Sequence, residues 1–180
     1  LAFWPNSLDS VNHLLQFGIW LMAGVALAIL FVYDLKWLIL PDRVVFPLIG
    51  LGAASAILVG LDVRNPGYFV FNLLGSVAIL SGFYFFLYVI SKGKWVGFGD
   101  IKLGLGLALL LCNWQLAILA FFLANLIGTL IFAPALSTGK IKSTAHIPFG
   151  PFLIEGFFIA GLFGHYIIDW YVDLTYSGIM

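Results

Sequence analysis

Two long apolar runs of the chain are separated by a short charged and glycine-containing stretch, Lys94-Trp95-Val96-Gly97-Phe98-Gly99-Asp100-Ile101-Lys102-Leu103. Asp100 stands where this stretch gives way to the second apolar run. An ionisable side chain at the edge of a segment that crosses a bilayer indicates a functional site, and it needs a partner. The positions of the other polar residues therefore decide what Asp100 can do.

The composition indicates an integral membrane protein. Of the 180 residues, 63% are hydrophobic and 9% are charged, whereas about 25% of the residues of a soluble domain are charged. Eight basic and eight acidic residues cancel, so no basic field is present to attract nucleic acid. The single cysteine, Cys112, excludes an internal disulfide and a cysteine-rich zinc module. No His, Cys, Asp or Glu cluster has metal-ligand spacing, so we expect neither metal nor cofactor.

The apolar runs predict an all-α protein with six transmembrane helices in one membrane-embedded domain, residues 1–180. Four of the expected spans, each long enough for a hydrocarbon core of about 30 Å, are 14–33, 44–61, 68–91 and 149–170. The segment 103–134 is apolar except for Asn113 and Gln115, and it is either one long helix or two helices. A single helix would extend about 48 Å, so a break at 113–115 is favoured.

The basic residues predict the orientation of these helices, because short cytoplasmic loops of membrane proteins carry an excess of Lys and Arg. With six spans, the connections 34–43, 92–102 and 138–148 share one side of the membrane and contain seven of the eight basic residues. Only Arg64 lies on the other side. We therefore expect both termini outside and these three connections in the cytoplasm. A five-span arrangement would move two lysines of the last connection outside and fits the rule less well.

This topology restricts the partner of Asp100 to two carboxylates on the same side, Asp34 and Asp42. Asp34 ends an apolar run, where a carboxylate is costly unless it faces a polar cavity. Asp42 follows Pro41 and precedes the next run, as a helix N-cap residue does. Two converging carboxylates can share one proton, so that one activates water and the other donates to a substrate carbonyl. We expect Asp34 to be the reacting partner and Asp42 to be a structural cap.

Three separated motifs make the chain resemble the peptidase part of the bacterial type IV prepilin peptidases, aspartic membrane proteases with a Gly-x-Gly-Asp motif. They are Asp34 with Leu40-Pro41-Asp42, then 97–103, and then Ile147-Pro148-Phe149-Gly150-Pro151-Phe152-Leu153. The resemblance implies a multi-pass endopeptidase of the bacterial inner membrane. Such an enzyme removes the basic leader from prepilins and pseudopilins of type IV pilus and type II secretion systems, on the cytoplasmic side and after a glycine.

The resemblance also assigns roles to residues. Asp34 and Asp100 take the catalytic roles, and Gly97, Gly99 and Lys102 shape the site around the second aspartate. Lys102 would bias the charge on Asp100, contact the leader, or simply extend into solvent. The other residues implied to shape the site are Pro41, Asp42, Pro148, Gly150 and Pro151, of which the last three are expected to fix the start of the final helix.

A Gly-x-Gly-Asp string by itself is equally typical of a glycine turn followed by an aspartate that caps a helix. Full-length family members also usually carry an amino-terminal region with two Cys-x-x-Cys pairs, associated with methylation of the new pilin amino terminus. This sequence has no such region. Because the chain begins at Leu1, it is either a fragment or a short peptidase-only member. We expect neither methyltransferase activity nor a zinc site in it.

Two alternatives use the same residues differently. A presenilin-like intramembrane protease would be consistent with Tyr33-Asp34, the Gly-x-Gly-Asp motif and Pro134-Ala135-Leu136, but it needs more helices than 180 residues supply. A small proton-coupled transporter would carry its acidic residues near the middle of the spans, whereas the three candidate aspartates gather at one face of the membrane. His146 is expected to be a solvated loop residue, and Glu155 receives no role.

Overall fold

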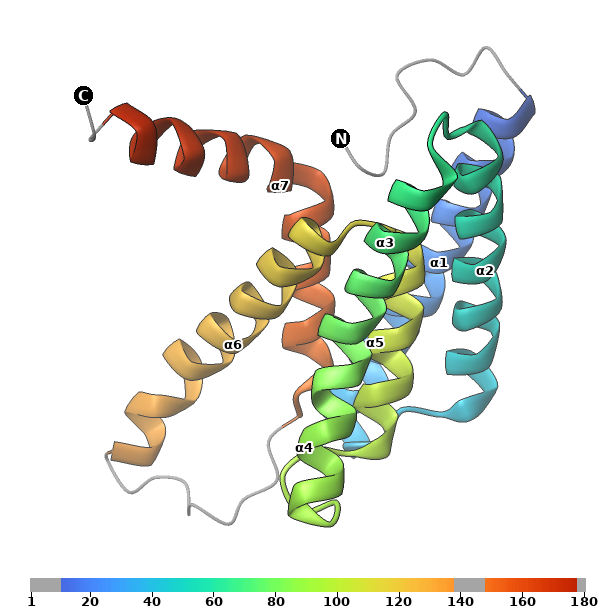
Figure 1. Ribbon diagram of the computed structural model, residues 1–180. Helices are drawn as coiled ribbons and strands as arrows, with labels where there is room; N and C mark the ends of the chain where they lie inside the picture. Colours follow the sequence, from blue (N-terminus) through green and yellow to red (C-terminus); the bar gives the residue numbers. More distant parts are fainter. Residues whose placement is uncertain (1–10, 138–147, 178–180) are drawn as a thin grey trace.

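The computed structural model describes residues 11–137 and 148–177, and all of the regular secondary structure in these ranges is helical (Figure 1). The all-α prediction is thereby confirmed. The helices are α1 (Val11–Trp37), α2 (Asp42–Asp62), α3 (Pro66–Val77), the π-helical turn η1 (Ala78–Gly82), α4 (Phe83–Ser91), α5 (Phe98–Leu111), α6 (Trp114–Ser137) and α7 (Gly150–Ser177).

Five helical segments of this described part are long and apolar enough to cross a membrane: Val11–Trp37, Asp42–Asp62, Pro66–Ser91, Trp114–Pro134 and Gly150–Tyr176. The third of these consists of α3, η1 and α4. The sixth expected span corresponds to α5, which has only 14 residues. At a rise of 1.5 Å per residue α5 extends about 21 Å, less than the hydrocarbon core of about 30 Å. The described chain therefore has five helices of membrane-crossing length and one shorter helix.

The long apolar segment 103–134 is broken close to the predicted position, between α5 and α6. Cys112 follows the last residue of α5 in a left-handed conformation, with φ of 48°. The side-chain oxygen of Asn113 accepts hydrogen bonds from the backbone N–H groups of Gln115 (2.9 Å) and Leu116 (3.1 Å). These bonds satisfy amides that the start of a helix leaves without partners. The prediction of two helices in this segment is confirmed.

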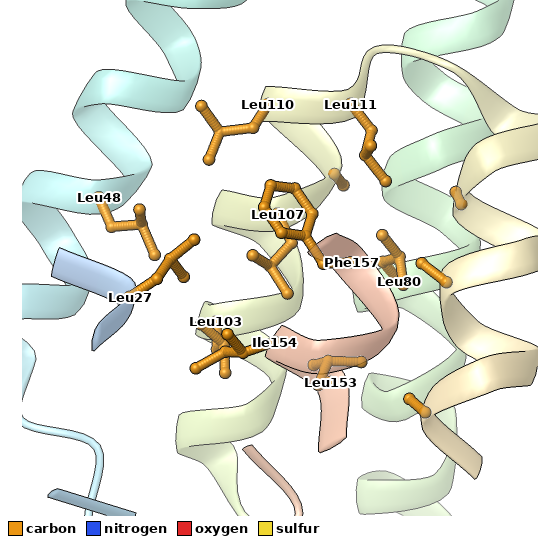
Figure 2. Packing of buried hydrophobic residues seen from close by; sticks show 14 of the residues in the cluster. Leu27, Leu48, Leu80, Leu103, Leu107, Leu110, Leu111, Leu153, Ile154 and Phe157 are labelled. Carbon is orange, nitrogen blue, oxygen red and sulfur yellow. The ribbon is translucent and has the colours of Figure 1, made fainter. Parts of the chain in front are cut away.

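The short helix α5 lies inside the bundle, where it packs against α2, α3, η1, α4, α6 and α7. Figure 2 shows its leucines among side chains from the surrounding helices. Leu103 and Leu107 are completely buried, as are Leu48 of α2 and Phe157 of α7. A helix that is apolar all round is typical of such an enclosed position. The enclosed position of α5 fixes Asp100, in the first turn of this helix, relative to the rest of the bundle.

A close contact with η1 fixes the position of α5 along its own axis. Gly104 approaches the backbone carbonyl of Leu80 so closely that a Cβ would clash with it. The hydroxyl of Ser81 donates to the carbonyl oxygen of Ile101 at 3.0 Å, and that of Ser76 donates to Ala108 at 3.0 Å. Because Ile101 directly follows Asp100, the π-helical turn anchors the start of the helix that carries this carboxylate.

Candidate active site

Asp34 lies in the last turn of α1 and is buried, with 5% of its surface exposed. Its Oδ2 accepts a hydrogen bond of 2.9 Å from the backbone N–H of Gly150, the first residue of α7. A carboxylate is stabilised at the start of a helix, where N–H groups have no partner within the helix. The first and the third sequence motif therefore meet, although 116 positions separate the two residues.

Asp100 is the third residue of α5, and Gly97 is the residue that caps this helix. The Oδ2 of Asp100 accepts from the N–H of Gly97 at 3.2 Å, and the N–H of Asp100 donates to the carbonyl of Gly97 at 3.2 Å. The carboxylate thus supplies the acidic half of a capping box. Oδ1 of Asp100, like Oδ1 of Asp34, has no hydrogen bond to any residue that the structure describes. Each carboxylate keeps one oxygen available for chemistry.

Leu40 connects the surroundings of the two carboxylates. A Cβ built on Gly99 would lie 3.1 Å from the Cβ of Leu40, and a Cβ built on Gly150 would lie 3.5 Å from its Cδ2. One leucine side chain therefore packs against the glycine beside Asp100 and against the glycine that binds Asp34. The sequence motif contains Leu40, but nothing in its pattern distinguishes this contact from ordinary core packing.

The electrostatics of Asp100 couple it to Asp34. Asp100 is partly buried in the first turn of α5. This helix is not one of the five helices of membrane-crossing length. Burial raises the pKa of Asp100 to about 7, with a further upward contribution from the charge of Asp34, while the N–H of Gly97 acts in the opposite direction. Two carboxyl groups that interact in this way titrate as a pair. Burial therefore favours the protonated form of Asp100.

Asp42 does not cap α2, so that prediction is wrong. Asp42 is itself the first residue of the helix, the capping position is occupied by Pro41, and no side-chain cap is formed. Its Oδ1 instead makes an ion pair with the ammonium group of Lys102. The Lys102 nitrogen also lies 5.4 Å from the ring centres of both Phe46 and Phe98. Lys102 is therefore held by a partner on α2 rather than extended into solvent, and the pair joins the starts of α2 and α5.

The third motif forms the beginning of α7, as expected. Pro148 precedes the helix and is partly buried, Gly150 is its first residue, and Pro151 in the first turn is buried. Gly150 also does what the sequence did not predict, because its N–H binds Asp34 directly. Glu155 is partly buried one turn further along α7. His146 lies outside the described residues.

An aromatic residue that no sequence motif singles out lies beside the start of α7. Tyr84 of α4 is 3% exposed, and its ring centre lies 5.3 Å from that of Phe149, the residue before Gly150. Its position within an aromatic run, Phe83-Tyr84-Phe85-Phe86, gives no signal that only this ring turns inward.

Within residues 11–137 and 148–177, no group of three or more His, Cys, Asp or Glu residues could hold a metal ion.

The chain is similar to known proteins of one family. The model of the type IV leader peptidase family matches residues 21–133. The prepilin leader peptidase/N-methyltransferase of Bacillus subtilis is 34% identical over 151 residues, which is 83% of this chain and 57% of the relative. The protein of the same name from Pseudomonas aeruginosa is 31% identical over 165 residues, which is 89% of this chain and 54% of the relative.

A third relative with this name, from Aeromonas hydrophila, is 28% identical over 152 residues, or 84% of this chain and 51% of its own length. The chain thus spans about half the length of the curated relatives it matches. No solved structure matches the chain. The family match includes Asp34, Asp42, Asp100 and Lys102, and it favours the prepilin peptidase interpretation of the Gly-x-Gly-Asp motif over the presenilin-like one. The chain belongs to the type IV leader peptidase family.

Proposed function

We propose that the chain is the peptidase part of an aspartic endopeptidase that removes the basic leader from type IV prepilins and pseudopilins. One observation carries the proposal: Leu40 packs against Gly99, which precedes Asp100, and against Gly150, whose N–H binds Asp34, so that the motifs of both aspartates meet at one place. The names of the relatives supply the substrate class, since each is a prepilin leader peptidase/N-methyltransferase. The expected partners are the substrate proteins and membrane lipid, without nucleic acid.

In the proposed mechanism, Asp100 supplies the proton and Asp34 receives one. Asp100, with a pKa of about 7, retains a proton on a large share of molecules at neutral pH and donates it to the carbonyl oxygen of the scissile bond. Asp34, whose Oδ2 is occupied by Gly150, takes a proton from water through Oδ1 as the water oxygen adds to the carbonyl carbon. The tetrahedral intermediate then collapses. The C–N bond breaks as the leaving nitrogen takes the proton from Asp34, and one hydroxyl group of the intermediate returns its proton to Asp100.

The proposed orientation puts this site at the cytoplasmic face of the bacterial inner membrane, with both termini outside. The basic residues of two connections support it. The helix ends on either side of 38–41 carry Lys36 and Arg43, and the connection 92–97 carries Lys92 and Lys94. Figure 1 draws the α1–α2 connection, the α4–α5 connection and the start of α7 at the same end of the bundle. Lys36, Arg43, Lys92 and Lys94 belong to this end, in agreement with the excess of basic residues in cytoplasmic loops. α5 then runs from this face through the interior of the bundle.

The test is leader removal in membranes that contain the protein and a prepilin, followed on a gel. The parent should convert the prepilin to a shorter product, whereas Asp34→Asn and Asp100→Asn should give no detectable product. Asp42→Asn serves as a matched carboxylate control and should still give product, although it weakens the ion pair with Lys102. If both first variants cleave like the parent, the assignment of the catalytic pair is wrong. If Asp42→Asn alone is inactive, Asp42 rather than Asp34 reacts.

A further inference from the structure

A polar pair, Tyr84 of α4 and Asn125 of α6, lies between otherwise apolar helices beside the start of α7. The side-chain nitrogen of Asn125 donates to the hydroxyl oxygen of Tyr84 at 3.4 Å and to the backbone carbonyl of Phe121 at 2.7 Å. Tyr84 is buried, whereas Asn125 is exposed on a helix long and apolar enough to cross a membrane. An exposed amide in such a helix is costly and indicates a function.

The position of Tyr84 ties this pair to both halves of the proposed catalytic site. Its ring packs against Phe149, which directly precedes the residue that binds Asp34. The π-helical turn immediately before α4 is bonded through Ser81 to Ile101, the residue after Asp100. Tyr84 thus packs at the start of α7, and the turn that precedes its helix is bonded to the start of α5.

The Tyr84–Asn125 pair has one hydrogen-bond donor and one acceptor without a partner among the described residues. The Tyr84 oxygen accepts from Asn125, so its own O–H proton has no acceptor among the residues that the structure describes. The side-chain oxygen of Asn125 has no donor in the same ranges. A hydroxyl can donate one hydrogen bond, and an amide oxygen can accept two. One free donor beside one free acceptor complements the C=O and N–H groups of an extended peptide.

A peptide substrate in an apolar environment needs partners of this kind. The backbone groups of a helix bond to one another, but cleavage requires the segment around the scissile bond to be unwound. In a membrane the groups released in this way cost several kcal/mol each, roughly, unless other polar groups satisfy them. Tyr84 and Asn125 offer such groups beside the start of α7, where the N–H of Gly150 binds Asp34.

We propose that Tyr84 and Asn125 form a subsite for the main chain of the unwound substrate next to the scissile bond. The hydroxyl of Tyr84 donates to a peptide carbonyl oxygen, and the side-chain oxygen of Asn125 accepts from a peptide N–H. The identity of the substrate as a prepilin rests on the proposed function, while the ligand chemistry, an extended peptide segment, rests on the two side chains.

Tyr84→Phe and Asn125→Leu test the subsite in the full chain reconstituted in lipid. Loss of a hydrogen bond to the substrate should lower kcat/KM for prepilin cleavage about three- to tenfold in each variant. Tyr88→Phe, one turn further along α4, and Thr129→Val, one turn further along α6, are matched controls and should stay within about twofold of the parent. Tyr84→Phe keeps the ring that packs against Phe149, so its thermal unfolding should match that of the parent.

A binding measurement separates the subsite from the catalytic assignment. Intact prepilin is titrated onto the Asp100→Asn protein in nanodiscs, with and without Tyr84→Phe. A weaker affinity with Tyr84→Phe supports the subsite. Equal affinities, together with unchanged cleavage by the Tyr84 and Asn125 variants, overturn it while leaving the proposed function intact. If Asp34→Asn and Asp100→Asn cleave normally, the catalytic assignment fails, and the kcat/KM values of the Tyr84 and Asn125 variants still decide the subsite.

Discussion

At the scale of single residues, Gly150 controls the geometry of Asp34. A Cβ at this position would lie 2.7 Å from the Oδ2 of Asp34, closer than two such atoms can approach. We predict that Gly150→Ala displaces the carboxylate and lowers prepilin cleavage at least about tenfold, since a misplacement of about 1 Å can cost about a hundredfold in rate. The measurement is the initial rate of leader removal at equal protein levels in the membrane.

Gly50→Ala provides the control for this change. A Cβ at Gly50 meets nothing within 4 Å, and alanine is favoured over glycine inside a helix such as α2. Its cleavage rate should equal that of the parent. A Gly150→Ala protein that cleaves as fast as Gly50→Ala would mean that the bond from Gly150 to Asp34 does not position the reacting carboxylate.

At the scale of elements, the ion pair between Asp42 and Lys102 joins α2 to α5. We predict that Asp42→Lys and Lys102→Asp each lower the rate of prepilin cleavage about three- to tenfold. In either variant two like charges face each other, and their repulsion moves the starts of α2 and α5 apart. The double exchange should recover most of the parent rate. Lys94→Asp, an exposed change in the connection before α5, controls for charge alone. A double variant no faster than its slower single variant would refute a positioning role for the pair.

The elements also mark where sequence reasoning ends. The order of the apolar segments and the positions of the basic residues were sufficient to predict that Asp34 and Asp42 lie at the same end of the bundle as Asp100. It could not match Asp42 with Lys102, which lies 60 positions away, because that pairing depends on how each helix is rotated about its axis. The same limit concealed the inward position of Tyr84 within its aromatic run.

At the scale of the whole molecule, the length of α5 is the main departure from the predicted six spans. Hydropathy counts apolar residues, but the start of the helix at Phe98 and the turn at Cys112 after it limit the helical part to 14 residues. Because α5 is enclosed by other helices, it can be shorter than the membrane. The contact between Gly104 and Leu80 that holds it requires a π-helical turn, which no sequence period indicates.

The orientation of the whole bundle gives the last prediction. Cys112 is the only cysteine, so a Cys112→Ala background allows single cysteines to be introduced at Lys92, near the proposed catalytic face, and at Arg64, at the opposite end. A membrane-impermeant thiol reagent added to intact cells with a permeabilised outer membrane should label Arg64→Cys. Lys92→Cys should react only after the inner membrane is opened, because basic connections stay in the cytoplasm. Labelling of Lys92→Cys in sealed cells would place the two aspartates outside, where they could not meet a prepilin before export.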